Sequence, residues 1–262
     1  MLPETMTLAG FCWVAFSIFL LAMSKGGFPV GPIALPFLVL LWPSETESAK
    51  QAVAFMLPVM CTMDVVAIWL YRREILWRRV LPLVPGALLG VVLAGMLFAQ
   101  AGASVFAITD SFLKLLIGCT GLVFIFYRVF RRRILRRLIN SNPRISTSLA
   151  FGLGAGITST IAHAGGPVAQ MYYLPQGLKK LNLAATMAGF FFILNAVKLA
   201  PFTFHGRITG ETLRLGLLVL PVVPLGVLSG WFLVHRIREK WYIPFLYVVL
   251  AVTSTTLILK AL

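Results

Sequence analysis

Two pairs of adjacent glycines interrupt apolar stretches of the chain, Gly26-Gly27 near the start and Gly165-Gly166 past the middle, and a proline follows each pair closely. Proline suits the first turn of a helix, because its missing N–H would be unpaired there. Each break is therefore expected to begin a new helix. Free N–H groups and the positive end of the helix dipole favour anions, and glycine has no Cβ to keep a ligand away. All four glycines are predicted to bind an anion; the alternative is that they pack two tight helix crossings.

Two lysines lie in apolar surroundings, where an ammonium group is costly unless it is paired or faces water. Lys25 adjoins the first break, and Lys198 lies within a later apolar stretch. Asn195 precedes Lys198 by three positions and shares its helix face. We predict that Lys25, Lys198 and Asn195 supply charge and an amide to one bound oxyanion, with the Ser159 hydroxyl as a further donor. Lys198 could instead snorkel to the membrane surface, and Ser159 could bond back to its own helix.

Two more groups could carry protons. Asp64 is the one acid well inside a clear apolar span. It could be the counter-ion of a lysine, a protonatable group in ion coupling, or a neutral acid with a local hydrogen bond, and pairing with a lysine is the favoured interpretation. His163 adjoins the second break and titrates near neutral pH, although a lone histidine often just donates to a carbonyl. Proton coupling through Asp64 or His163 is a hypothesis.

The composition indicates that most side chains of this chain are surrounded by lipid. Of 262 residues, 59% are hydrophobic and 12% are charged, about half the charged share of soluble domains. Basic residues cluster in short runs between apolar segments, which indicates membrane topology rather than nucleic-acid binding. No motif for an enzyme, a metal or a cofactor is present, and none of these is expected. Six stretches are long enough to cross a bilayer as helices: 52–70, 80–99, 112–130, 183–204, 213–234 and 242–258.

The sequence pattern indicates an internal duplication of the chain. The glycine pairs are 139 residues apart, and so are the Pro82-x-x-Pro85 and Pro221-x-x-Pro224 pairs. We therefore divide it into a first transmembrane repeat (1–130), a basic cytoplasmic linker (131–147) and a second transmembrane repeat (148–262).

The charge pattern favours inverted repeats. If each interrupted stretch is a re-entrant hairpin, more Lys and Arg residues fall on the side of the basic linker than if each stretch crosses fully, and retained loops carry positive charge. The predicted fold is an all-α integral membrane protein with two homologous, inverted repeats. Each repeat has a Gly-Gly-interrupted helix, either re-entrant or broken, followed by three transmembrane helices.

The second half also carries the motif of a known family. The segment 152–167 (GLGAGITSTIAHAGGP), followed by Ala184-Ala185-Thr186 and Asn195-x-x-Lys198, resembles the TauE/SafE family of sulfite exporters and toluene-sulfonate uptake permeases. The resemblance implies a multi-pass protein of the bacterial inner membrane that carries a small sulfur-containing anion, such as sulfite, sulfoacetate or another organosulfonate. It also adds the Thr186 hydroxyl to the predicted substrate contacts.

The predicted function is secondary transport of such an anion by alternating access, with protons as a hypothetical coupling ion and the lipid bilayer as surroundings. Two alternatives stay open, a passive anion channel and a membrane scaffold or assembly factor that binds no ligand. The oligomeric state, the exact substrate and the direction of transport also stay open.

Overall fold

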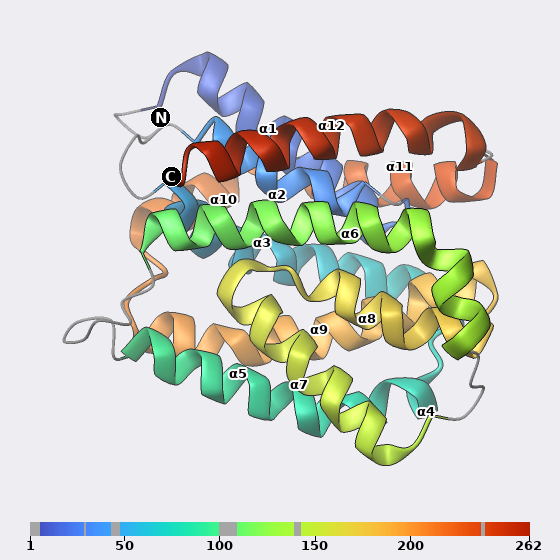
Figure 1. Cartoon of the computed structure of the whole chain (residues 1–262). Helices are drawn as coiled ribbons and strands as arrows, with labels where there is room; N and C mark the ends of the chain where they lie inside the picture. The colour runs from blue at the N-terminus through green and yellow to red at the C-terminus, as the bar shows by residue number, and fades with distance from the viewer. Residues whose placement is uncertain (1–5, 29, 43–47, 100–108, 139–142, 237–238) are drawn as a thin grey trace.

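The computed structural model describes residues 6–28, 30–42, 48–99, 109–138, 143–236 and 239–262, and its regular elements are all helices (Figure 1). In chain order these are α1 (Leu8–Lys25), α2 (Gly31–Leu40), α3 (Ser48–Tyr71), α4 (Trp77–Val80), η1 (Leu81–Leu83), α5 (Val84–Ala99), α6 (Asp110–Leu138), α7 (Ile145–Ala162), α8 (Gly165–Tyr173), η3 (Leu174–Gln176), α9 (Lys180–Phe204), α10 (Gly210–Val219), α11 (Val222–Arg236) and α12 (Glu239–Leu259).

Within the described residues, six helical segments are long and apolar enough to cross a membrane: α1, α3, Trp77–Met96 through α4 and α5, the first part of α6, α7 and α9. The spans predicted over 52–70, 80–99, 112–130 and 183–204 are thus confirmed. The span predicted over 213–234 is broken, because α10 and α11 meet at an angle of 51°. The stretch predicted over 242–258 lies within α12.

Both glycine breaks are sharp reversals of the chain. In the first, Trp13 on α1 stacks on Phe37 of α2 with ring centroids 4.2 Å apart, so α2 runs back along α1. In the second, the hydroxyls of Ser148 and Tyr172 are 2.8 Å apart, and α8 runs back along α7 (Figure 1). We call these pairs the first hairpin (α1–α2) and the second hairpin (α7–α8).

The backbone at each tip explains the reversal. Gly27 has φ 94°, a conformation that side chains with a Cβ rarely adopt. At the second tip His163 takes the left-handed conformation, with φ 49°, and ends α7. The N–H of His163 donates to the Ser159 carbonyl at 3.0 Å, which is the αL motif of a helix end. α2 begins at Gly31, two positions after the predicted Pro29, which lies outside the described residues.

The hairpins are held by glycine-lined helix crossings. A Cβ at Gly152 or Gly156 of α7 would collide with the backbone of η1 or α5, and a Cβ at Gly226 or Gly230 of α11 would collide with α1. Small residues let membrane helices approach closely. The second hairpin therefore rests on α5, and the first rests on α11.

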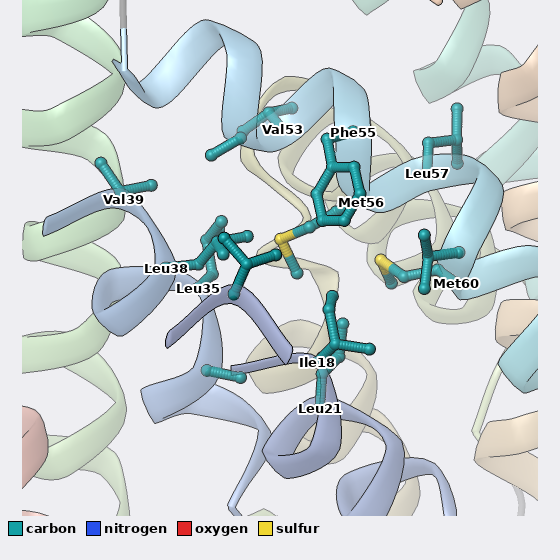
Figure 2. Packing of buried hydrophobic residues seen from close by; sticks show 14 of the residues in the cluster. Ile18, Leu21, Leu35, Leu38, Val39, Val53, Phe55, Met56, Leu57 and Met60 are labelled. Atoms are coloured by element: carbon teal, nitrogen blue, oxygen red, sulfur yellow. The ribbon is translucent and has the colours of Figure 1, made fainter. Parts of the chain in front are cut away.

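Helices α3 and α9 cross antiparallel through the centre. The Asn182 side chain, near the start of α9, donates to the Glu74 carbonyl just beyond α3 at 3.0 Å, while Asn195 farther along α9 meets Asp64 of α3. The main apolar core packs α1, α2 and α3 together; Figure 2 shows Ile18 and Leu21, Leu35 and Leu38, and Phe55 to Met60 meeting there.

Candidate functional site

A cavity of about 430 Å³ lies between the tips of the two hairpins. The first hairpin contributes Lys25, Gly27 and Gly31 to its wall, and the second contributes His163 and Gly166. The two breaks, 139 residues apart in sequence, therefore line one space, as the paired glycines predicted. Helix α6 and the first half of α9 complete the wall with mostly apolar side chains.

The two glycines of each break have different surroundings. Gly26 is buried against α11, where an added Cβ would collide with the carbonyl of Val227. Gly165 is buried against its own hairpin, where a Cβ would come within 2.8 Å of the Ser159 Cβ. Gly27 and Gly166 instead line the cavity, and a Cβ on Gly166 would have no neighbour within 4 Å. One glycine of each pair therefore packs against a neighbouring helix or hairpin, and the other lines the cavity.

Both short helices begin at the cavity. Gly31 is the first residue of α2, and Gly166 lies in the first turn of α8. Neither helix has a side chain capping its N-terminal N–H groups. These groups and the dipole of each helix raise the electrostatic potential at the wall of the cavity.

Lys25 on the cavity wall belongs to a chain of buried polar groups. Its Nζ donates to Asp64 Oδ1 at 2.5 Å, and Asn195 Nδ2 donates to Asp64 Oδ2 at 2.5 Å. The predicted pairing of Asp64 with a lysine is confirmed. Lys25 also lies 5.2 Å from the centre of the Phe191 ring, within reach of a cation–π attraction. Asp64 is fully buried, while Lys25 keeps 10% of its side chain exposed.

Lys198 belongs to a second chain of polar groups. Its Nζ contacts the Ser159 carbonyl at 3.2 Å, the Ser159 hydroxyl at 2.9 Å and His163 Nδ1 at 3.1 Å. The other ring nitrogen of His163, Nε2, lies 2.8 Å from the Val53 carbonyl. Lys198 is fully buried, and His163 is the member of this chain that reaches the cavity wall.

The remaining predicted contacts lie away from the cavity surface. Asn195, Ser159 and Thr186 are buried, with at most 1% of each exposed, and they do not line the cavity that the described residues form. Thr186 accepts a hydrogen bond from the Leu76 N–H at 3.3 Å. The Oδ1 atom of Asn195 has no hydrogen-bond partner among the described residues. Asn195 is thus connected to the cavity through Asp64 and Lys25. Lys198 is connected to it through His163.

Sequence reasoning missed several polar or aromatic groups of the cavity, among them Gln170, Lys180 and Phe191. Gln170 lies one turn after Pro167 on the same face of α8, a spacing that could have revealed it. Lys180 begins α9 and is exposed, so the cavity reaches the molecular surface there. No pattern in the sequence marks Phe191 as a cavity residue, because its contact with Lys25 depends on how α9 packs against α1.

These features define a polytopic helical membrane protein with a central, cation-bearing cavity between two reversed helix pairs. No group of three His, Cys, Asp or Glu side chains that could hold a metal occurs among the described residues.

The sequence profile of the family described as Sulfite exporter TauE/SafE matches residues 11–257, and the chain belongs to this family. Members are membrane transporters with several spans, not enzymes. The resemblance on residues 152–198 is therefore confirmed, and the family implies an anionic substrate. No curated protein and no solved structure matches the chain significantly.

Proposed function

We propose that this protein is a secondary transporter that binds a small sulfur-containing anion in the cavity between the hairpin tips. The observation that carries the proposal is the shared wall: Lys25 and the starts of α2 and α8 all meet one cavity. An ammonium group has three N–H donors. Lys25 uses one of them for Asp64, which leaves donors for an oxyanion.

The size and lining of the cavity favour an organosulfonate over sulfite. A volume of about 430 Å³ lies in the range typical of pockets for organic ligands, about 300 to 1,000 Å³, whereas sulfite has only four heavy atoms. Leu21, Met187 and Phe191 contribute apolar surface. The sulfonate would bind Lys25 and the helix starts, and the carbon skeleton would pack on these side chains.

We further propose that the two halves are inverted repeats in a bacterial inner membrane, with the basic linker in the cytoplasm. The hydrogen bond from Asn182 to Glu74 brings the start of α9 beside the end of α3. The basic runs 72–79 and 179–180 therefore share one end of the bundle, and the positive-inside rule assigns that end to the cytoplasm. Because the cavity reaches the surface at Lys180, it would open to the cytoplasm in this conformation.

Thermal unfolding of the detergent-purified protein tests the proposal. Sulfite, sulfate, sulfoacetate, isethionate, taurine and simple carboxylates are added in turn, since a ligand of the folded state raises the Tm. A sulfonate is expected to raise it most. Gly166→Ala adds a methyl group to the cavity and should reduce the shift. Gly210→Ala is the matched control, because its Cβ would also meet nothing within 4 Å but lies outside the cavity.

Transport by proteoliposomes separates the remaining alternatives. A transporter exchanges labelled sulfonate for unlabelled sulfonate trapped inside, whereas a channel conducts the anion without exchange. Exchange that Gly166→Ala slows and Gly210→Ala preserves is the expected result. If no anion raises the Tm and none is exchanged, the proposal is wrong and the glycine breaks serve folding alone.

A further inference from the structure

We propose that Lys198, rather than Asp64, is the proton-binding site of this transporter, and that its proton enters from the cavity through His163. The inference rests on the proposed anion transport and specifies the group to which a coupled proton binds. It departs from the sequence-based hypothesis, which considered Asp64 or His163 as the coupling group and assigned Lys198 to the substrate.

Asp64 is a poor candidate for reversible protonation. Each of its carboxylate oxygens accepts a hydrogen bond, one from Lys25 and one from Asn195, both at 2.5 Å. Both bonds favour the ionised carboxylate, because charge-assisted hydrogen bonds are stronger than neutral ones. Protonation would weaken both contacts and leave the Lys25 ammonium without a counter-ion.

Lys198 has the opposite surroundings. It is fully buried, yet it forms no ion pair with a carboxylate in the part of the chain that the structure describes. The titratable groups that face it are Lys25 on α1 and Asp64 and Cys61 on α3, together with His163 at the end of α7. Asp64 is already committed to Lys25. The positive charge of Lys198 is therefore not locally balanced.

The contacts of Lys198 satisfy both of its protonation states. An ammonium can donate its three hydrogens to the Ser159 carbonyl, the Ser159 hydroxyl and His163 Nδ1. A neutral amine can donate two hydrogens, to the carbonyl and the ring nitrogen, while its lone pair accepts the hydroxyl hydrogen of Ser159. Serine permits this exchange because a hydroxyl both donates and accepts. In both states every hydrogen and lone pair of the Lys198 amine has a partner, so Lys198 can gain or lose a proton without moving.

His163 connects this site to the cavity. The Val53 carbonyl can only accept, so Nε2 of His163 carries a hydrogen and, in the neutral ring, Nδ1 is the acceptor. Nδ1 faces Lys198 at 3.1 Å, and the ring lines the cavity. When the ring turns about its Cβ–Cγ bond, Nδ1 can take up a proton from cavity water. When the ring turns back, Nδ1–H donates that proton to the amine of Lys198, and the ring is neutral again. The proton leaves along the same path.

Charge balance links this proton to the anion. With Lys198 neutral, Lys25 and Asp64 cancel, so the buried part of the empty site has no net charge, while Lys180 at the mouth of the cavity is exposed to water. A monovalent sulfonate beside Lys25 would add one negative charge, and a proton on Lys198 would restore neutrality. Net charge is costly at membrane depth, so anion binding and protonation of Lys198 favour each other. The expected stoichiometry is one proton for each monovalent anion, carried in the same direction without net charge movement.

The test measures proton uptake on binding. Purified protein in weakly buffered detergent solution receives isethionate, whose sulfonate stays ionised over the pH range used, and an indicator dye reports the pH. The wild type is expected to take up one proton for each anion bound. Lys198→Met should bind isethionate with lower affinity and without proton uptake. Lys260→Met, which removes an exposed lysine at the end of α12, is the matched control and should behave as the wild type does.

Proteoliposomes provide a second measurement. Under an imposed pH gradient the wild type should accumulate labelled isethionate, whereas Lys198→Met should exchange it without accumulation. If Lys198→Met does not fold, His163→Gln supplies the test, because a glutamine cannot relay the proton. Proton uptake or gradient-driven accumulation that survives in these variants overturns the inference while anion transport stands. If the wild type binds no sulfonate at all, the proposed function itself fails, and the inference fails with it.

Discussion

The first and second hairpins have the same architecture, but the lysine beside each tip has a different kind of partner. At the tip of the first, Lys25 is paired with the carboxylate of Asp64. Beside the tip of the second, Lys198 Nζ contacts Ser159 and His163 Nδ1 and forms no ion pair with a carboxylate among the described residues. One tip thus carries a charge that is balanced within the protein, and the other lies beside a charge that is not. The same reversal of the chain therefore fits the two roles proposed above, a fixed cation for the substrate and a group that changes its protonation.

The largest effect should follow from breaking the balanced pair. Asp64→Ala leaves the mostly buried ammonium of Lys25 without a partner, and removing one member of a buried pair costs about 3 kcal/mol or more of unfolding free energy. Lys198→Met removes an amino group that forms no ion pair among the described residues, so it should cost only about 1 kcal/mol for the lost hydrogen bonds. Chemical unfolding in mixed micelles measures both values.

A double variant serves as the control for this comparison. Lys25→Met combined with Asp64→Leu removes both charges and should recover most of the stability that Asp64→Ala loses, as replacement of buried ion pairs by apolar residues does elsewhere. Equal losses for Asp64→Ala and Lys198→Met would contradict the difference between the two hairpins.

A smaller effect should show that Gly26, at the first tip, packs against α11. Gly26→Ala places a methyl group against the backbone of α11, and overpacking of this kind costs about 1 to 3 kcal/mol. Gly210→Ala, in open space, should change the stability by no more than about 0.5 kcal/mol. Thermal unfolding of both variants without ligand gives the comparison. A Gly26→Ala protein as stable as the wild type would show that α1 and α11 can separate freely.

The smallest effect concerns Thr186. Thr186→Val removes the acceptor for the Leu76 N–H and should cost about 1 kcal/mol of unfolding free energy. Isethionate affinity should stay within a factor of two, because Thr186 is buried away from the cavity. Titration calorimetry measures this affinity. A tenfold loss would instead support the substrate contact that the family resemblance implied.

Local sequence predicted those features of the site that depend on one segment at a time. Glycine pairs marked both reversals, and a lone acid in an apolar span indicated a lysine partner. The bond between Asp64 and Asn195 was not predictable, because it joins α3 to α9 across 131 positions. The division of each glycine pair into a packing and a cavity-lining residue likewise depends on which helix lies opposite, and no local pattern contains that information.

The proline pairs show a further limit of sequence patterns. Pro82-x-x-Pro85 and Pro221-x-x-Pro224 have the same spacing and predicted equivalent spans. In the first half the pair lies within one continuous span, Trp77–Met96, through the short turn η1. In the second half it accompanies the bend of 51° between α10 and α11. A proline removes one helix hydrogen bond in either place, and the packing around it determines whether the helix bends.

That bend has a mechanical consequence for the cavity. Helix α11 supports the tip of α1 through Gly26 and Gly230, whereas α7 rests on α5, whose span has no comparable bend. The Lys25 tip thus packs against a bent helix pair, α10–α11, whereas the hairpin that ends at His163 packs against the continuous span of α5. A change in the angle between α10 and α11 would therefore move Lys25 relative to His163 and change the width of the cavity between them.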